Sequence, residues 1–448
     1  MREPGAVLLI SCYELGHQPF GLALPLGFLE RAGFSPAALD VAVEPLDEAA
    51  VARARVVGIS VPMHTALRLG VRVAERVRRV NPGCHVCFYG LYASLNAGYL
   101  LAHGADSVVG GEVEATLVAL VEALERGEPA EAVAGVATRR RPAAPVLARL
   151  PFARPSRRGL PPLDRYARLE RGDGRAEVAG YVEASRGCRH LCRHCPIPPV
   201  YGGRFFVLPR ELVLEDIRQQ VAAGATHITF GDPDFLNGPG HALRLVRALH
   251  AEFPHVTFDV TAKIEHILRH RALFPELARA GCAFVVSAVE SLNDAVLANL
   301  EKGHTRADVL EALAVLRGAG LPLRPSFVPF TPWETLESYG ELFDFVEREE
   351  LVEHVDPVQY TIRLLVPPGS RLLDQPAMRP FLGPLDEGAF TYRWTHPDPR
   401  MDRLQQAASR LVEAAAAAGE APALTFARLR ALARAAREGG EAALAAAA

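Results

Sequence analysis

The sequence predicts an α/β chain in which a doubly wound parallel sheet is followed by a partial (βα)6 barrel and a helical C-terminal tail. Short apolar runs of strand length alternate with helical stretches in two separate series, and the sequence between the two series lacks periodicity. Strands that alternate with helices pair in parallel through right-handed crossovers. The expected domains are 1–126 for the doubly wound sheet, 127–175 for a linker, 176–374 for the barrel and 375–448 for the tail.

The first series predicts an open sheet, in which ligands bind outside the carboxyl ends of the strands. Ser60, Gly90, Gly110 and Gly111 lie at those ends, and we expect them to contact a cofactor. Glycine lets backbone approach a ligand closely, although these glycines could equally be ordinary turns. The expected strands are Ala6–Ile10, Ala37–Val41, Val56–Val61, His85–Tyr89 and Asp106–Val109, and the expected helices cover 20–32, 47–53, 65–79, 94–103 and 113–126.

The second series contains six βα-type units, which are too few for a closed eight-stranded barrel but enough for a partial one. The arginines before it, in 139–141 and at 157–158, are expected to be solvated residues of the linker. Met401–Ala418 and Thr425–Ala448 are Ala-rich and expected to be helical. The expected strands are Val178–Ser185, Thr226–Phe230, Val256–Thr261, Ala283–Val289, Leu323–Val328 and Val358–Leu364, with helices near 210–223, 240–251, 266–280, 293–299, 306–318 and 334–349.

The composition is that of an ordinary globular protein, with 448 residues, 49% hydrophobic and 23% charged. Forty-nine basic and 52 acidic residues give a net charge of -3, which leaves no strong field to attract nucleic acid or a membrane surface. Lys263 and Lys302 are the only lysines. No apolar run of ~18 residues occurs outside the Ala-rich tail, and the amino terminus is typical of a first strand rather than a signal peptide. We therefore expect a cytoplasmic protein with no membrane or nucleic-acid partner.

Three of the seven cysteines, Cys188, Cys192 and Cys195, follow directly after the first strand of the second series. Their Cys-x3-Cys-x2-Cys spacing closes a small loop, and thiolates are soft ligands suited to zinc or iron–sulfur clusters. No obvious fourth cysteine is present, so one iron of a [4Fe-4S] cluster would lack a protein ligand. The alternative is structural zinc with His190 or His194 as the fourth ligand, in a non-catalytic binding protein.

The cysteine spacing at the start of a partial barrel resembles the signature of the radical S-adenosylmethionine (SAM) superfamily. The resemblance implies that Cys188, Cys192 and Cys195 hold a [4Fe-4S] cluster and that SAM chelates the fourth iron. It further implies reductive cleavage of SAM to methionine and a 5′-deoxyadenosyl radical, which abstracts hydrogen from a substrate. The substrate, a small molecule or a peptide, is unknown, and the implied electron donor is a flavodoxin or a ferredoxin.

The resemblance also implies which residues contact SAM. His194 holds the position whose backbone lies against adenine, and Gly231 and Asp232 lie in the segment that meets the amino group. Glu290 matches the place of a polar residue at the ribose or carboxylate, and Ser326 and Val366 match further SAM contacts. Each residue also has an ordinary structural alternative, as a turn, a helix cap or a backbone partner.

The first series resembles the cobalamin-binding domain of a large radical SAM branch that includes methyltransferases, cyclases and ring-rearranging enzymes. The Asp-x-His-x-x-Gly signature of a lower axial histidine is absent, and His17 does not fit it. Tyr89–Tyr92 replaces a Gly-Gly-x-His-like turn, whereas 110–112 is retained as Gly-Gly-Glu. The resemblance leaves two alternatives open: a cobalamin-dependent radical SAM methyltransferase, or a domain that serves as a scaffold or substrate lid.

Two further sets of residues carry weaker expectations. Cys12, Cys84, Cys87 and Cys282 are expected to be packed and inert. Cys84 and Cys87 form a Cys-x2-Cys, but residues three apart on a strand point to opposite faces, which favours core packing over metal or redox chemistry. The run from Cys195 to 206 is similar to a subgroup named for a Cys-Cys-Ala-Glu-Pro or selenocysteine-containing tail, and this sequence has no such tail. The candidates to face substrate are Tyr201, Arg204, Lys263, Tyr360 and Arg363.

Overall fold

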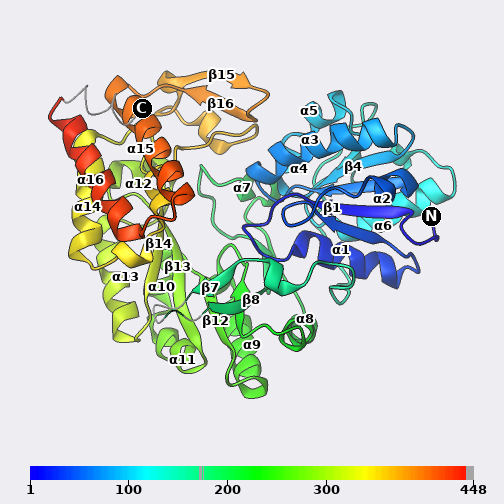
Figure 1. The fold of residues 1–448 in the computed structure, drawn as a ribbon, viewed down its shortest axis with the longest axis horizontal. Coiled ribbons are helices and arrows are strands. Elements are labelled where there is room, and N and C mark those ends of the chain that lie inside the picture. Colours follow the sequence, from blue (N-terminus) through cyan, green and yellow to red (C-terminus); the bar gives the residue numbers. More distant parts are fainter. Residues whose placement is uncertain (171–173, 175, 440–448) are drawn as a thin grey trace. The chain divides into compact units, whose positions relative to one another are not determined.

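The structure is a computed structural model that describes residues 1–170, 174 and 176–439 (Figure 1). The chain divides into two compact units. The first comprises Met1–His190, Pro196–Phe258 and Glu387–Phe390, and the second comprises Leu191–Cys195, Asp259–Asp386 and the described residues from Thr391 on. Among the described helices, none is both long enough and apolar enough to cross a bilayer.

The first sheet confirms the predicted doubly wound fold. Its strands are β1 (Val7–Ser11), β2 (Ala37–Asp40), β3 (Val56–Ser60), β4 (His85–Tyr89), β5 (Ser107–Val109) and β6 (Val136–Ala137), and its helices are α1 (Phe20–Arg31), α2 (Glu48–Arg53), α3 (His64–Val80), α4 (Leu91–Leu95), α5 (Ala97–Ala102) and α6 (Glu114–Glu125). The strand order is β2-β1-β3-β4-β5-β6, and β1 to β5 pair in parallel. In Figure 1, α3 and α5 lie on one side of this sheet and α1 on the other.

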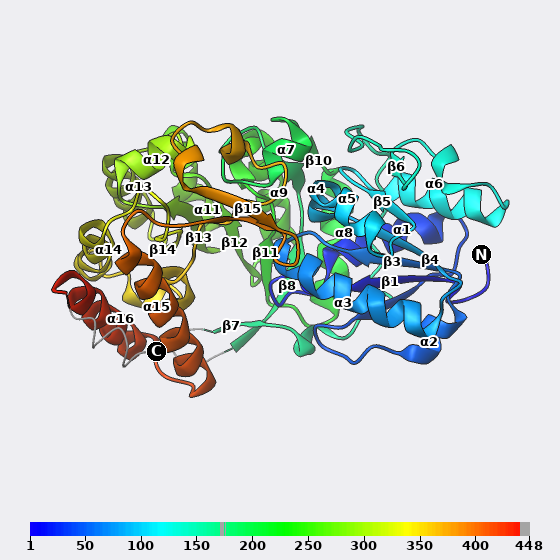
Figure 2. The ribbon, with the colours of Figure 1, turned by 90° about the horizontal axis from the view of Figure 1, so that it is seen from above.

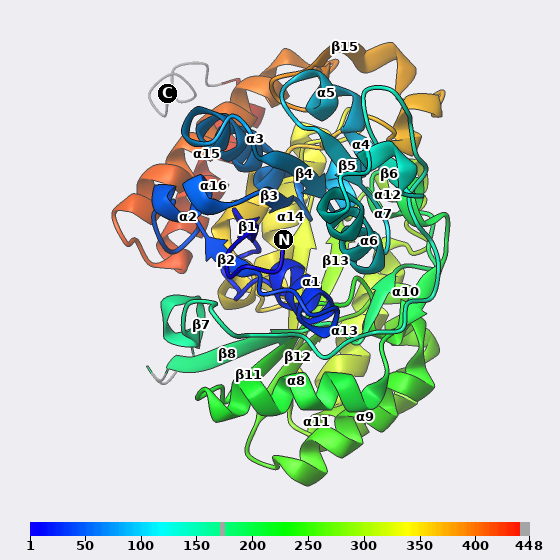
Figure 3. The same cartoon turned by 90° about the vertical axis from the view of Figure 1, so that its right-hand side faces the viewer.

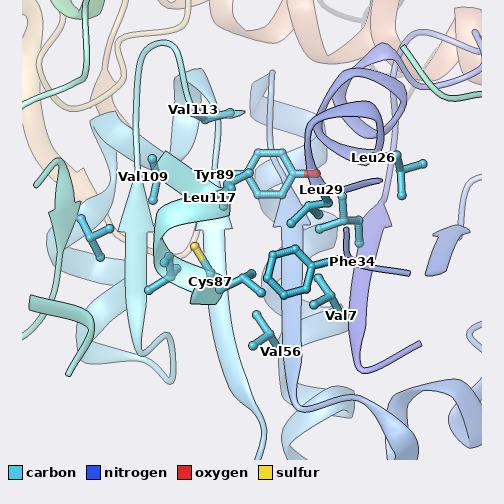
Figure 4. Packing of buried hydrophobic residues seen from close by; sticks show 14 of the residues in the cluster. Val7, Leu26, Leu29, Phe34, Val56, Cys87, Tyr89, Val109, Val113 and Leu117 are labelled. Atoms are coloured by element: carbon cyan, nitrogen blue, oxygen red, sulfur yellow. The ribbon is translucent and has the colours of Figure 1, made fainter. Parts of the chain in front are cut away.

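The core of this sheet explains why its strands are continuous apolar runs. Figure 4 shows Val7, Val56 and Cys87, from three neighbouring strands, packed with Leu26 and other residues of the helical layer. Every residue of β1 and of β3 is buried. A parallel sheet covered on both faces has no solvent side, so its strands show no polar alternation.

The range 127–175 differs from the expected solvated linker in several features, among them the edge strand β7 (Arg168–Glu170). Strand β6 also lies within this range and extends the first sheet by pairing antiparallel with β5. Arg157 is not solvated: its side chain is 9% exposed and forms two hydrogen bonds, of 2.9 and 2.7 Å, to Asp216. A two-residue strand is too short to produce a periodic pattern, and the buried partner of Arg157 lies far along the chain.

The second sheet is the curled sheet of a half-barrel. Its strands are β7 (Arg168–Glu170), β8 (Ala176–Val182), β11 (His227–Phe230), β12 (Thr257–Thr261), β13 (Cys282–Glu290) and β14 (Leu323–Phe327), in the order β14-β13-β12-β11-β8-β7. The pairs β8–β11 and β13–β14 are parallel, and β7 is an antiparallel edge strand. Figure 3 shows α8 (Arg210–Ala222) and α9 (Pro239–Glu252) side by side, and the two helices are in contact.

The expected sixth strand of the barrel, Val358–Leu364, is wrong. Pro357–Tyr360 forms a 3-10 helix capped by Asp356, whose side chain accepts a hydrogen bond from the Val358 backbone. Only Arg363 continues the ladder, through an isolated parallel bridge to Phe330. Pro357 lacks a backbone N–H and has a fixed φ, which favours a turn over a strand at this position.

The remaining helices of the barrel follow the prediction closely, except that the expected helix 266–280 is divided. It consists of α10 (Ile264–Arg269), a 3-10 turn (Arg271–Leu273) and α11 (Phe274–Arg279), with Pro275 in the first turn of α11. The expected helix 94–103 is likewise divided, into α4 and α5 at Asn96. The other helices are α12 (Asp294–Leu300), α13 (Arg306–Gly318) and α14 (Leu336–Arg348).

The tail contains a β-hairpin that the sequence did not indicate, formed by β15 (Leu382–Asp386) and β16 (Thr391–Trp394). It is followed by α15 (Pro399–Ala417) and α16 (Pro422–Arg437), which contact each other and which Figure 2 places at the C-terminal end. Helices were expected in both places. The end of the second expected helix, 440–448, lies outside the described residues.

Candidate functional site

The cysteine loop follows β9 (Ser185–Gly187), which pairs antiparallel with β10 (Phe205–Val207), and precedes α7 (Ile197–Tyr201). Gly187 has φ +73°, and a Cβ at this position would lie 2.4 Å from the Arg204 carbonyl oxygen. Only glycine fits at this turn into the loop. Cys188 and Cys192 are buried, Cys195 is half-buried, and none of the three is in a disulfide.

In the first unit, polar groups surround Cys188. The Asn237 side-chain N–H donates to Cys188 Sγ at 3.6 Å, and the side-chain oxygen of the same residue, Oδ1, accepts from the Arg189 backbone N–H at 3.3 Å. His190 Nε2 lies 3.4 Å from a carboxylate oxygen of Asp234. A donor aimed at sulfur stabilises the thiolate form, which is the form that binds metal.

Asp232 anchors the strand that leads into this loop. It accepts hydrogen bonds from the Ala184 backbone N–H at 2.8 Å and from the Ser185 hydroxyl at 2.5 Å. Burial raises the pKa of Asp232 to about 7, although these hydrogen bonds oppose the shift. A Cβ on the neighbouring Gly231 would lie 1.9 Å from the Tyr181 hydroxyl, so this glycine is required for internal packing.

In the second unit, two predicted site residues, Glu290 and His194, lie in contact, and Lys302, which the sequence did not indicate, also contacts Glu290. Glu290 Oε1 lies 3.0 Å from His194 Nε2 and 3.1 Å from Lys302 Nζ. Burial alone would raise the pKa of Glu290, but Lys302 and then His194 lower it below its ordinary value. Glu290 has φ +68°, a left-handed conformation that is uncommon and costly outside glycine.

The other residues expected to contact SAM have structural partners in the second unit. Ser326 is half-buried in β14, opposite Ala288 of β13. Val366 is fully buried, and its N–H donates to the Thr391 hydroxyl while its carbonyl oxygen accepts from the Tyr392 N–H. These hydrogen bonds attach the segment after the barrel to the tail hairpin.

A cavity of about 260 Å³ lies within the first unit, at the carboxyl ends of β1, β3 and β4. Apolar side chains, including Leu15, Pro62, Met63 and Leu91, form part of its wall. Ser60, Gly90 and Gly111 also line it, as expected for residues at these strand ends. The same cavity is lined from the barrel side by 181, 183 and 185–187, directly before Cys188.

The three glycines predicted to contact a cofactor in the first unit, Gly90, Gly110 and Gly111, differ in how close a Cβ at each would come to other atoms of the chain. A Cβ on Gly110 would lie 2.5 Å from the Ser94 side chain, and one on Gly111, which has φ +78°, would lie 2.1 Å from the Val146 carbonyl oxygen. A Cβ on Gly90 would lie 3.3 Å from Val61 backbone. The chain itself therefore makes close approaches at Gly110 and Gly111.

A buried ion cluster connects this cavity to the cysteine loop, within the first unit. Arg186, two residues before Cys188, contacts Glu114 at 2.6 Å, Glu183 at 2.8 Å and Glu112 at 3.8 Å. The Tyr201 hydroxyl donates to Glu112 at 3.0 Å. Burial raises the pKa of Glu112 to about 7, and one oxygen of the buried Glu114 has no hydrogen-bond partner among the described residues.

Glu14, in the loop after β1, adds a further carboxylate to the cavity wall. Both of its oxygens accept from the Gly21 backbone N–H, at 3.1 and 3.3 Å. Burial raises the pKa of Glu14 to about 8. The buried Tyr89 donates from its hydroxyl to the Gly21 carbonyl oxygen at 2.9 Å, so both side chains hold the start of α1 against the strand ends.

No histidine lines this cavity among the described residues. The His17 ring stacks on Tyr181 at a centroid distance of 4.8 Å, and His64 Nε2 lies 2.7 Å from the Ala389 carbonyl oxygen. This agrees with the absence of the axial-histidine signature.

The candidates to face substrate are distributed differently from the expectation. Tyr201 lines the cavity, Arg204 is exposed, and Lys263 lies 3.8 Å from Cys192 Sγ. Tyr360 is 1% exposed in an aromatic core with Phe343 and Phe426, and Arg363 is paired with Asp402 at 2.6 Å. The last two are structural in this fold. Sequence reasoning missed Arg186, Glu114, Glu14 and Lys302.

The other cysteines are buried and free, as expected for packed residues. Burial raises the pKa of the Cys87 thiol to about 12, and burial followed by Asp40 raises the pKa of Cys12 to about 12. The thiol form of both is therefore stable at neutral pH. Neither has the activated thiolate that metal binding or redox chemistry requires.

The fold and the site define a two-part α/β protein that carries a three-cysteine loop at the start of a half-barrel and a cavity at the strand ends of an open sheet. Residues 182–346 match the family model of the Radical SAM superfamily, and residues 6–121 match the model of the B12 binding domain. The chain is a radical SAM superfamily enzyme with an N-terminal B12-binding domain. This confirms the family resemblance, and the non-catalytic zinc alternative is not supported.

Several known proteins are similar to this chain. An uncharacterized methyltransferase of Pyrococcus horikoshii, PH0819, is 24% identical over 316 residues, which are 69% of this chain and 65% of that protein. The hopanoid C-3 methylase of Methylococcus capsulatus is 26% identical over 326 residues, which are 71% of this chain and 62% of that protein. The chain therefore spans less than two thirds of the length of either relative.

The fold is shared with a solved structure of the cobalamin-dependent SAM radical enzyme OxsB, which has aqua-cobalamin and SAM bound. The TM-score is 0.72 at 16% identity, over 91% of this chain and 66% of OxsB. The radical SAM domain implies a [4Fe-4S] cluster and SAM as cofactors. The three cysteines are in no disulfide, and a side-chain N–H donor lies at Cys188 and another at Cys192, which is the chemistry that an anionic thiolate-bound cluster requires.

Proposed function

We propose that the chain is a cobalamin-dependent radical SAM methyltransferase. In this proposal residues 1–126 hold the corrinoid, 176–374 hold the cluster and SAM, and the electron donor is a flavodoxin or ferredoxin. The observation that carries the proposal is the cavity, whose wall combines strand ends of the B12-binding domain with the barrel segment before Cys188. The names of the two relatives support methyl transfer over the hydrogen abstraction that the sequence led us to expect.

The residues of the cavity fit a macrocycle with an apolar face and an amide-bearing rim. Leu15, Met63 and Leu91 offer apolar contact, and Glu114 offers an unpartnered carboxylate oxygen that can accept an amide N–H. Cobalamin, when bound, supplies a cobalt centre that can carry a methyl group between SAM and substrate. The cavity volume of about 260 Å³ is small for a whole corrinoid, so in this proposal the corrinoid extends out of the open side of the cavity.

The carboxylates of the cavity can hold or accept a proton near neutral pH. Burial raises the pKa of Glu14 to about 8 and the pKa of Glu112 to about 7, in each case within reach of solution pH. Because its pKa lies above 7, Glu14, which lines the cavity directly, is mostly protonated at neutral pH.

Product analysis with anaerobically reconstituted protein, a reductant and SAM tests the proposal, with and without added hydroxocobalamin. We expect bound cobalamin after desalting and cobalamin-dependent formation of S-adenosylhomocysteine. If the protein retains no cobalamin and 5′-deoxyadenosine is the only SAM product in both samples, the chain performs cobalamin-independent radical chemistry and the proposal is wrong.

A matched pair of variants connects the result to the cavity. Met63→Arg introduces a cationic side chain at the cavity wall and should abolish cobalamin retention. Leu424→Arg places the same side chain on the exposed surface of α16 and should retain cobalamin as the parent protein does. Equal retention by the two variants would place the corrinoid elsewhere.

A further inference from the structure

Both lysines of the chain lie in the second unit of the structure. The sequence contains 49 lysines and arginines, and all of them except Lys263 and Lys302 are arginine. Both lysines are buried, at 8% and 3% exposure. Arginine serves at every other basic position of this chain, including buried ones such as Arg157 and Arg186, so the two lysines indicate sites that need a compact ammonium group.

Lys263 contacts a predicted cluster ligand directly. It follows β12 and precedes α10, and its Nζ donates to Cys192 Sγ at 3.8 Å. Its Nζ also lies 3.7 Å from a carboxylate oxygen of Glu265. That carboxylate is shared with Arg269, which it contacts at 2.5 Å. The positive charge at Lys263 is therefore not fully offset by Glu265.

Lys302 is arranged differently. Its Nζ is paired at 3.1 Å with Glu290, which also contacts His194 at 3.0 Å. Burial alone would lower the pKa of Lys302, but Glu290, with smaller contributions from Cys192 and Cys195, raises it. The charge of Lys302 is matched by a buried carboxylate, so its main effect is to position Glu290.

We propose that Lys263 is a positioning residue that sets the reduction potential of the cluster, through a charge-assisted hydrogen bond to the Cys192 thiolate. Reduction adds one electron to the cluster, and a cation at a ligating sulfur stabilises the more negative state. The potential of an iron–sulfur cluster depends on hydrogen bonds to its sulfurs and on nearby charge. The proposal rests on the cluster that the radical SAM domain implies, not on methyl transfer.

The test is a potentiometric titration of the reconstituted full-length protein, followed by electron paramagnetic resonance, with iron measured in each sample. In Lys263→Met, we expect the ratio of reduced to oxidised cluster at a fixed potential to fall at least about tenfold, or ~59 mV for one electron. Glu265→Gln removes the neighbouring negative charge and should shift the potential in the opposite direction. Glu341→Gln, an exposed carboxylate on α14, is the control and should match the parent protein.

The variants also separate this proposal from a general loss of structure. If Lys263→Met does not retain iron, Lys263→Arg, which keeps the charge, is titrated together with Glu265→Gln. The proposal then predicts a near-parental potential for the first and a raised potential for the second. Parental potentials in Lys263→Met and Glu265→Gln, at full iron content, would overturn it whether or not the protein transfers methyl groups.

Discussion

Replacing Arg186 with methionine should destabilise the first unit strongly, because it leaves three carboxylates without their shared cation. Arg186 is 12% exposed and lies 2.6, 2.8 and 3.8 Å from Glu114, Glu183 and Glu112. A pair of charges ~4 Å apart interacts by about 4 kcal/mol at an effective dielectric constant of ~20. Desolvation offsets much of the sum, and removing one partner of a buried ion pair typically costs about 3–5 kcal/mol.

The assay is thermal unfolding of the parent protein and of Arg186→Met, followed by circular dichroism. At ~2 °C per kcal/mol for a unit of this size, a loss of about 4 kcal/mol lowers the midpoint by roughly 8 °C. The loss should shrink from pH 8 to pH 6, because burial already holds the pKa of Glu112 at about 7 and protonation removes the unpaired charge. Arg126→Met, an exposed control, should be silent. An unfolding midpoint of Arg186→Met equal to that of the parent protein would show that Arg186 does not stabilise the three carboxylates.

Three other predictions concern single groups. The folded-state pKa of Glu14, about 8, exceeds the unfolded value near ~4.3, so stability should fall as pH rises from about 5 to 8, and Glu14→Gln should flatten that dependence in urea titrations. Lys302→Met leaves the buried Glu290 with His194 but without its ammonium partner and should cost about 3–5 kcal/mol in the same titrations, whereas Lys302→Met with Glu290→Gln should cost less than the sum of the single changes. Cys192→Ala should abolish iron binding, and Cys84→Ala should retain about four irons by colorimetric assay.

The sequence was informative about the site where chemistry depends on local spacing. The three cysteines share one loop, so their spacing alone indicated a thiolate ligand set. Arg186 and Glu114 form a 2.6 Å contact although 72 positions separate them, and no local pattern marks such a pair. The Gly-Gly-Glu at 110–112 was the one local signal for this ion cluster, because Glu112 and the nearby Glu114 both contact Arg186.

The fold was predictable wherever elements were long and apolar. Strand β4 was expected at its observed bounds, because its residues are buried on both sides. The prediction of a sixth barrel strand was wrong. Val358 and its neighbours are apolar, which indicated a strand, but Pro357 and the cap at Asp356 turn the backbone. Gly111 was expected to contact a cofactor because glycine permits close approach; it lines the cavity, and its backbone also makes a close approach to Val146 that the sequence did not indicate.

The proposed transfer of a methyl group from SAM by way of cobalamin can be followed with SAM deuterated in its methyl group. The reconstituted protein is incubated with that SAM, hydroxocobalamin and a reductant. The corrinoid is then recovered in the dark and its mass is measured by mass spectrometry. We expect a trideuterated methyl group on the recovered corrinoid, together with one S-adenosylhomocysteine for each methyl group transferred. Unlabelled corrinoid, with SAM converted only to methionine and 5′-deoxyadenosine, would show that the protein does not transfer a methyl group through cobalamin.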